Sequence, residues 1–416
     1  MISLENFIDI LNDQLEEESI EIEISDKDYT LSSRYIKRTY PNIFLKQNNY
    51  NSTLENELTV RQQIDGSEID TPFFFFDKNN KIDLIGNMIF ILEGYHYKNH
   101  GYDSFGRFDF KSTPYYRKGL FHRMLYEEYL YFLCNELKIK YPKQKVSITL
   151  TCDIDRPLSR INSINGLLKS LLADIVLRKS IGLFFRRILS NILPLRVGGF
   201  FFDPFNTYEY IIGLKKRFRL KEIIFFLLIE TPKNKKNKID KTLNVQSEGY
   251  QSILKILDQE DIKLGLHPSF SSSKTNIEQI REESYLYKKL EVGNNYSISR
   301  AHYLIYNEDY LQKLTALNYT DDYSLGSEYF IGFTNGTSRP IKRQVGKRII
   351  TLHNLTFMDV VYFKDKKKYT KDLDLILNEI RLWGGNFILL WHNNYLQTNK
   401  EKKELEKILN KAACVE

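Results

Sequence analysis

From about residue 145 onward, short apolar segments alternate with helical patterns, and few folds accommodate such an alternation. The clearest segment, "KEIIFFLLIE" (221–230), is a continuous apolar run of the kind that is buried on both faces of a parallel sheet. Segments such as "GYQSILKILDQED" and "KDLDLILNEIRLWGG" carry apolar residues at helical spacing. Strands that alternate with helices form parallel βα units, so the sequence predicts an α/β fold of barrel type.

The length of 416 residues leaves room for a second domain, and a hydrophobic content of 42% is enough to build a full core. Before residue 145 the short strand patterns "LTVRQQID" and "TPFFFFDK" and the helical pattern "DLIGNMIFILEGYHY" indicate a mixed α/β region without a catalytic cluster. We expect an N-terminal α/β domain over 1–144, a (β/α) barrel over 145–400 and a C-terminal helix or tail over 401–416.

Net charge and cysteine positions limit the classes of binding partner and the cellular compartment that we expect. A net charge of +7 without a clustered basic motif argues against a dedicated nucleic-acid-binding protein. Cys134, Cys152 and Cys414 are too far apart for a metal motif, which favours a reducing compartment. The acidic start does not resemble a signal peptide, so we expect a cytoplasmic protein. The segment "IGLFFRRILSNILPL" (181–195) is either an ordinary packed helix, which we prefer, or a peripheral contact with the inner face of an anionic membrane.

Polar side chains follow several of the predicted strands. In "SITLTCDIDRPLS", Asp153 and Asp155 are two residues apart and therefore face the same side of a strand. Two like charges so close repel each other, and a divalent cation would offset the repulsion by binding one carboxylate and leaving the other free as a base. Imidazole and carboxylate ligands with an open water position are typical of a catalytic Zn²⁺ site, which activates water for attack on an amide or ester carbonyl. The other candidates at strand ends are His267 in "GLHPSFSSS", Arg300 and His302 in "SRAHYL", and His392 in "LLWHNN".

This ordered set resembles the polysaccharide deacetylases of the NodB-homology fold (carbohydrate esterase family 4), a distorted (β/α) barrel. More specifically, "GLHPS", "SRAHYL" and "GFTNGT" are similar to the signatures of a bacterial subgroup with an extra N-terminal α/β region. The resemblance runs from about Lys145 to about Asn394, and weaker similarity extends into the N-terminal third.

The resemblance implies a metal centre with Zn²⁺ as the expected ion. Asp155 matches the metal-binding aspartate of the family and His267 matches its first metal-binding histidine. The second histidine of the family normally stands four residues later, where this chain has Ser271. We expect His302 to replace it, because His302 lies two residues after Arg300 on the same strand face.

The resemblance also implies the catalytic groups. Asp153 matches the base that activates water, and Arg300 matches the arginine that holds this base in place. His392 matches the general acid that protonates the departing amine. Asp321 or Asp322 matches the aspartate that tunes this acid, and the spacing to the following glycine favours Asp322.

The expected function is that of a metal-dependent N-deacetylase acting on a sugar of a surface polysaccharide or its precursor. The alternative is a catalytically degenerate member of the fold that binds a glycan or a protein partner, and nucleic-acid binding is the least favoured interpretation.

Overall fold

A computed structural model of the protein divides into two compact units. Unit 1 comprises 1–146, 326–342 and 365–386, and unit 2 comprises 147–325, 343–364 and 387–416. The structure describes residues 4–15, 18–25, 27–44, 57–98, 100–160, 163–232, 234, 239–240, 244–259, 262–274, 277–290, 292 and 297–415. The expected boundary at 144 lies near the first border between the units, whereas two segments of the expected barrel belong to unit 1. The division into domains at 144 and 400 stays a prediction.

Among the described residues, nine strands of unit 2 form one curled sheet, in which parallel pairs predominate. Together with its helices, this sheet gives unit 2 a mixed α/β architecture. Their spatial order is β11 (Ile341–Val345), β12 (Arg348–Leu352), β10 (Asp321–Asp322), β9 (Ile298–Ser299), β8 (Ile262–Leu266), β7 (Glu222–Leu227), β6 (Ser147–Ile154), β14 (Asn386–Leu390) and β13 (Phe357–Met358). The predicted apolar strand at 221–230 is β7, an interior strand between β8 and β6, in which five of the six residues are buried. The sheet is consistent with the predicted barrel-type α/β fold.

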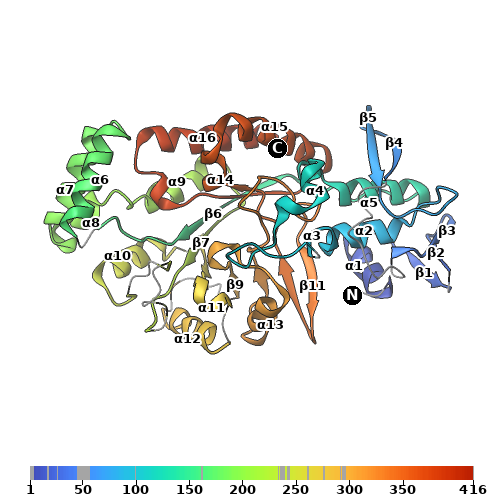
Figure 1. Ribbon diagram of the computed structural model, residues 1–416, viewed down its shortest axis with the longest axis horizontal. Helices are drawn as coiled ribbons and strands as arrows, with labels where there is room; N and C mark the ends of the chain where they lie inside the picture. The colour runs from blue at the N-terminus through green and yellow to red at the C-terminus, as the bar shows by residue number, and fades with distance from the viewer. Residues whose placement is uncertain are drawn as a thin grey trace. The chain divides into compact units, whose positions relative to one another are not determined.

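The helices of unit 2 follow its strands in sequence, as the alternating pattern predicts. They are α6 (Ile164–Val176), α7 (Ile181–Ile192), α8 (Gly199–Phe202), α9 (Tyr208–Arg217), α10 (Glu248–Leu257), α11 (Phe270–Lys274), α12 (Ile277–Lys288), α13 (Glu308–Ala316), α14 (Asp359–Lys364) and α16 (Asn399–Ala413). Short 3-10 turns lie at η5 (Leu195–Val197), η7 (His302–Leu304) and η8 (Asn393–Tyr395). Figure 1 shows β6 and β7 with α9, α14 and α16 drawn above them and α10, α12 and α13 below.

Side-chain caps explain where several of these helices begin. Ser247 and Asn307 accept hydrogen bonds from backbone N–H groups in the first turns of α10 and α13. At α16, Thr398 and Glu401 form a reciprocal capping box, which satisfies two N–H groups that the helix itself cannot bond. The helix starts are therefore set locally, by residues that lie just before each apolar face.

Unit 1 contains antiparallel strands and helices. Its strands are β1 (Glu21–Ile24), β2 (Asp28–Ser32) and β3 (Lys37–Pro41) in one sheet, and β4 (Leu58–Ile64) and β5 (Ser67–Phe73) in a hairpin. Its helices and turns are α1 (Leu4–Leu15), α2 (Leu84–Leu92), α3 (Tyr95–Lys98), η3 (Phe110–Ser112), α4 (Pro114–Arg117), η4 (Leu120–His122), α5 (Leu125–Leu137) and α15 (Lys366–Trp383). Buried Glu127 of α5 accepts hydrogen bonds from Arg339 and Thr337, which ties the segment 326–342 to the N-terminal residues.

No helix in the described parts of the chain combines the length and the apolar character that crossing a bilayer requires.

Candidate active site

The strands from β6 to β10 end in register, so their last residues gather at one edge of the sheet of unit 2. Ile154 of β6 pairs with Leu227 of β7, which pairs with Leu266 of β8. The same row continues through Ser299 of β9 to Asp322 of β10. Because these strands are parallel, the residues that follow them also meet at this edge, where open α/β sheets place their ligand sites.

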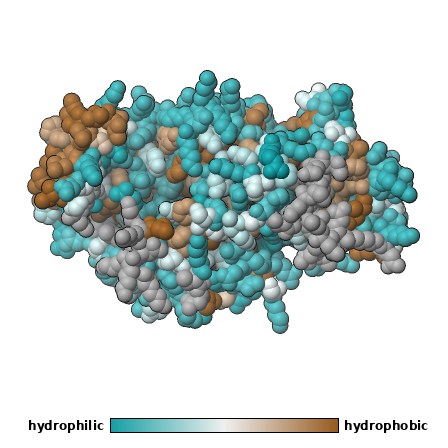
Figure 2. Space-filling view, viewed as in Figure 1, coloured by the Kyte–Doolittle hydropathy of each residue, from teal (hydrophilic) through white to brown (hydrophobic). Residues whose placement is uncertain are grey.

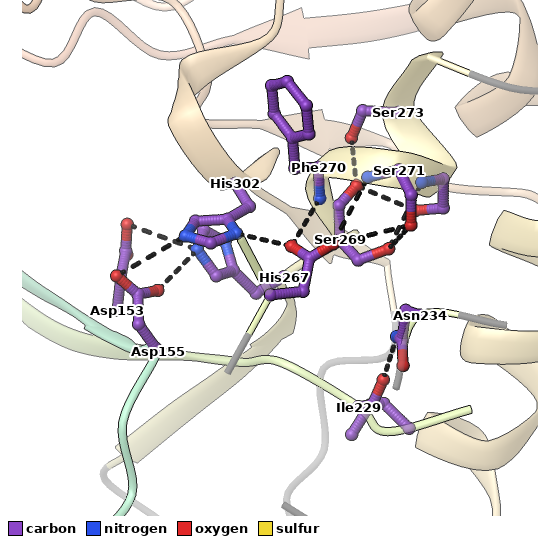
Figure 3. Close-up of polar contacts among 12 residues, drawn as sticks. Asp153, Asp155, Ile229, Asn234, His267, Ser269, Phe270, Ser271, Ser273 and His302 are labelled. Atoms are coloured by element: carbon purple, nitrogen blue, oxygen red, sulfur yellow. Dashed lines mark hydrogen bonds and ion pairs between the residues drawn. The ribbon is translucent and has the colours of Figure 1, made fainter. Parts of the chain in front are cut away.

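Asp155, His267 and His302 form a compact cluster at this edge (Figure 3). They follow β6, β8 and β9, respectively. One ligand atom from each residue lies within 4.8 Å of the other two. Nε2 of His267 is 3.0 Å from Oδ1 of Asp155, and Nε2 of His302 is 3.7 Å from Oδ2 of Asp155. The structure thus brings together the three residues that the sequence nominates as metal ligands.

The hydrogen-bond partner of Nδ1 in each histidine shows which ring nitrogen is available to the cluster. Nδ1 of His267 is 2.5 Å from the backbone carbonyl of Arg300, a group that only accepts hydrogen bonds. Nδ1 of His302 is 2.8 Å from Oδ1 of the buried carboxylate Asp240. Each Nδ1 therefore donates a proton, and in the neutral ring the lone pair of Nε2 points toward Asp155. A carboxylate or carbonyl behind the ring is the usual partner of a metal-binding histidine.

The cluster fits a divalent cation. Two imidazole nitrogens and one carboxylate oxygen are the ligand set of catalytic zinc sites, which keep a fourth position open. With metal–ligand bonds of about 2.0–2.1 Å, neighbouring ligands of a tetrahedral ion lie about 3.3 Å apart. The distances of 3.0 Å from His267 to Oδ1 and 3.7 Å from His302 to Oδ2 of Asp155 are close to that separation. Asp155, His267 and His302 therefore form a candidate metal site.

The electrostatics show that this cluster attracts positive charge. Burial opposes the ionised form of Asp155, but His302, His267 and His392 outweigh burial and hold its pKa well below the usual range. Burial lowers the pKa of His267, but the carboxylates of Asp153 and Asp155 outweigh burial, so the net shift is upward. Both directions have one cause, which is the attraction between the carboxylates and the protonated imidazoles at this edge, and a bound cation would take the place of the imidazolium charge.

Asp153 has partners different from those of Asp155. Its Oδ1 accepts a hydrogen bond of 2.9 Å from Nη1 of Arg300, while its Oδ2 lies 3.8 Å from Nε2 of His267. The guanidinium of Arg300 is fully buried, donates also to Thr151, and lies 4.5 Å from the centroid of the Phe226 ring. One oxygen of Asp153 is thus held by Arg300, and the other faces the cluster.

His392 approaches the cluster from the end of β14, with Nε2 3.5 Å from Oδ2 of Asp155. Its Nδ1 donates to Asp359 at 2.8 Å, and its backbone N–H donates to the same carboxylate at 2.7 Å. Burial lowers the pKa of His392, but the carboxylates of Asp359, Asp155 and Asp153, with Asp359 the largest contributor, outweigh burial and raise the pKa to about 10. The expectation that Asp322 or Asp321 lies beside His392 is wrong, because Asp359 occupies that place.

The two aspartates that were expected beside His392 have other partners. Asp322 is fully buried, and its carboxylate accepts hydrogen bonds from Ser299 and from both the N–H and the hydroxyl of Ser324. Burial raises the pKa of Asp322 in spite of these donors. Asp321 is 2.8 Å from Nε2 of His353. Asp322 therefore braces the ends of β9 and β10 and has no contact with the general-acid candidate.

Ser271, at the position where the polysaccharide deacetylases that the sequence resembles have a second metal histidine, takes part in a hydrogen-bond network behind His302 (Figure 3). Its hydroxyl accepts from Gln279 at 2.8 Å, and its backbone N–H lies 3.4 Å from Asp240. Asp240 also accepts from the N–H of Phe270 at 2.8 Å. Asp240 thus connects the loop after β8 to His302, and Ser271 is a support for that loop.

Asp240 and Asp359 are the functional-looking residues that the sequence interpretation missed. Asp240 lies in "KNKKNKIDK", which is typical of a charged surface loop and carries no strand pattern. Of that segment, the structure describes only residues 234, 239 and 240. Asp359 directly follows β13, a strand of two residues without a recognisable apolar run. Asp359 is therefore a polar residue at a strand end, like the candidates found from the sequence, but β13 is too short to be recognised in the sequence.

Comparisons with known proteins give no sequence relative and two distant structural neighbours. No family model and no curated protein matches the chain. A proposed polysaccharide deacetylase from Mycobacterium smegmatis aligns over 66% of this chain and 86% of its own, with 13% sequence identity and a TM-score of 0.40. A proposed polysaccharide deacetylase involved in O-antigen biosynthesis, from Bordetella bronchiseptica, aligns over 64% of this chain and 81% of its own, with 14% identity and a TM-score of 0.30. The functional assignment therefore depends on the geometry of the site.

Proposed function

We propose that this protein is a metal-dependent hydrolase that removes N-acetyl groups from a sugar of a surface polysaccharide or of its precursor. The observation that supports this function is the pair of acid–base groups at the metal cluster. Asp153 lies against His267, and His392 lies against Asp155. A cation site flanked by a free carboxylate and a protonated imidazole contains the groups that hydrolysis of an amide requires.

Asp155, His267 and His302 would hold the cation, and the expected ion is Zn²⁺ because two imidazoles and one carboxylate suit it. When bound there, a divalent ion would supply Lewis-acid chemistry, polarising the amide carbonyl and lowering the pKa of water. Asp240 and the carbonyl of Arg300 keep both imidazoles in the tautomer that binds metal through Nε2.

Asp153 is the general base. Oδ1 is occupied by Arg300, so Oδ2 accepts the proton of the attacking water. The water oxygen forms a bond to the acetyl carbon, and the carbon–nitrogen bond of the amide then breaks. Arg300 keeps the carboxylate oriented through this hydrogen-bonded ion pair.

His392 is the general acid. Its pKa of about 10 keeps the ring protonated near neutral pH, and its Nε2–H gives the proton to the departing nitrogen. Asp359 holds Nδ1–H and fixes the plane of the ring. The products are acetate and the free amine of the sugar, and the proton lost by His392 is returned from Asp153 through solvent.

The direct test is release of acetate from a panel of N-acetylated substrates, including free oligosaccharides and nucleotide-linked and lipid-linked sugars. The full chain should release acetate from at least one of them, and a chelator should stop the reaction until Zn²⁺ is restored. The matched control is His392→Gln, which keeps the metal ligands and removes the acid. A metal-loaded protein that releases no acetate from any member of the panel would contradict the proposal and favour a glycan-binding or partner-binding role.

A further inference from the structure

Helices α6 and α7 and the short helix α8 of unit 2 expose a continuous set of large apolar side chains. Figure 2 shows this apolar surface where Figure 1 places the three helices. On α6 the exposed apolar residues Ile164, Leu168, Leu172 and Val176 are spaced four apart and form one stripe along the helix. We call this surface the α6–α8 face, and its main members, all at least 56% exposed, are Ile164, Leu168, Leu172, Ile181, Phe185 and Phe201.

These helices bury charged residues and expose large apolar ones, which is the reverse of a helix that packs on a hydrophobic core. The only buried residue of α6 within its described span is Asp174. In α7 the buried residues include Arg187, whose Nε donates to Asp174 at 2.6 Å. Burying an ion pair is costly, whereas exposing isoleucine, leucine and phenylalanine forgoes hydrophobic stabilisation. An arrangement with charge inside and apolar residues outside favours a partner that covers the outer face.

The charges around the α6–α8 face are of one sign. Between residues 163 and 202 the chain has six lysines and arginines and a single acidic residue, Asp174. Because Asp174 is buried and paired with Arg187 and Arg178, the exposed charges of this segment are all basic. Exposed Lys169 and Lys179 belong to this set. Apolar side chains bordered by lysine and arginine are typical of helices that lie in the interface of an anionic bilayer.

A second copy of the chain is a less suitable occupant. In a two-fold contact the same surface faces itself, so the basic residues of the two copies would lie against each other. Such like-charge contacts oppose association. Anionic lipid headgroups, in contrast, complement both the apolar and the basic part of the surface.

The α6–α8 face is connected to the loops that carry the candidate site. Helix α6 begins nine residues after Asp155, within the connection from β6 to α9. The buried carboxylate of Asp203, which follows α8, accepts from the N–H of Ser159. Arg187 donates to Gln397, five residues after His392. The face is thus fixed to the same strand-end loops as the acid and a metal ligand.

We infer that this protein docks on an anionic lipid surface through the α6–α8 face, with α6 and α7 lying in the interface. Docking of this kind would keep the edge of the sheet that carries the candidate site near the bilayer. The inference does not depend on the proposed chemistry.

The test is co-sedimentation of the full chain with vesicles of phosphatidylcholine alone or of phosphatidylcholine with phosphatidylglycerol at three to one. Wild type should pellet with the mixed vesicles and much less with the neutral ones. The variant Leu172→Ser/Ile181→Ser/Phe185→Ser should lose about tenfold or more of this binding, because interfacial affinity scales with the buried apolar area. The charge variant Lys169→Gln/Lys179→Gln should weaken binding to the mixed vesicles and leave binding to the neutral ones unchanged.

The matched control replaces equally exposed apolar residues elsewhere, as Tyr285→Ser/Ile349→Ser/Leu375→Ser, and should bind like wild type. Metal content and the midpoint of thermal unfolding confirm that each variant is folded. Wild type that stays in the supernatant with both vesicle types would overturn the inference. A second contradicting result would be a concentration-dependent dimer of wild type, lost in the apolar variant, together with no binding to vesicles. That result would assign the face to a second copy of the chain.

Discussion

Asp153 and Asp155 lie two residues apart, yet their side chains have different partners. Asp153 is held by Arg300 at 2.9 Å, and Asp155 points at the two histidines. Asp153→Asn should lower turnover by about 10²–10⁴-fold, the usual contribution of a general base, and keep the metal. Asp155→Asn should lose the metal. Elemental analysis and acetate release on both variants separate the two roles, and loss of metal in Asp153→Asn alone would show that the roles are reversed.

Asp359 should control the pH range over which His392 acts as an acid. The imidazolium donates a proton only below its pKa, so activity falls as the pH rises through that value. Asp359→Asn removes the largest of the carboxylate charges that together raise this pKa to about 10, and it should move the alkaline limb of kcat/KM to lower pH. The control Asp322→Asn removes a carboxylate that is also buried but bonded to serines, and should leave the limb in place. An alkaline limb that shifts only in Asp322→Asn would contradict the assignment.

Asp240 links two structural elements, the segment before α10 and the 3-10 turn after β9. Asp240→Asn should weaken metal affinity by about 10–100-fold, since removing the carboxylate behind a ligating histidine has effects of that size. Ser271→Ala changes the same network without touching His302 and should leave metal affinity within the error of the measurement. Competition with a chromophoric chelator gives both values. Equal affinities in wild type and Asp240→Asn would show that Asp240 supports only the fold.

At the turn between α15 and β14, Gly384 is required by backbone geometry. Its φ is +80°, and a Cβ would lie 1.9 Å from the carbonyl oxygen of Gln144. Gly384→Ala should therefore cost at least about 2 kcal/mol of unfolding free energy. At Gly213, within α9, a Cβ would have no atom within 4 Å, so Gly213→Ala should stabilise by about 0.5–1 kcal/mol. Chemical denaturation measures both, and opposite signs for the two variants are the expected result.

The elements that could be predicted from the sequence are those with enough residues to show a period. β7 is an almost continuous apolar run, β6 alternates polar with apolar residues as a strand does, and α10, α13 and α15 show apolar residues at helical spacing, so the α/β alternation is confirmed. β10 and β13 have two residues each and leave no pattern, whereas β9, which is equally short, is indicated by the polar residues that follow it. Asp240 follows no strand, and Asp359 follows a strand too short to recognise, so neither could be found from predicted strand ends.

At the scale of the whole molecule, His96 in unit 1 should make stability depend on pH. Its Nε2 is 2.8 Å from the carbonyl of Thr334, and burial lowers its pKa from 6.5 to about 4. The unfolded chain therefore binds a proton more readily, and stability is lost as the pH falls from 6.5 to about 4. The shift corresponds to about 3 kcal/mol. Urea unfolding at pH 7, 5 and 4 should show this loss in wild type and a smaller one in His96→Asn; identical losses would count against His96 as the cause.

The proposed function depends most on a metal centre built from Asp155, His267 and His302, with His302 in the role that the family gives to a histidine at the position of Ser271. Elemental analysis of purified wild type and His302→Ala, both loaded with Zn²⁺ and then passed through a desalting column, tests this centre directly. Wild type should retain about one ion per chain, since three protein ligands and one open position form a single site. His302→Ala should retain far less. Equal metal content in the two proteins, or none in wild type, would contradict this metal centre.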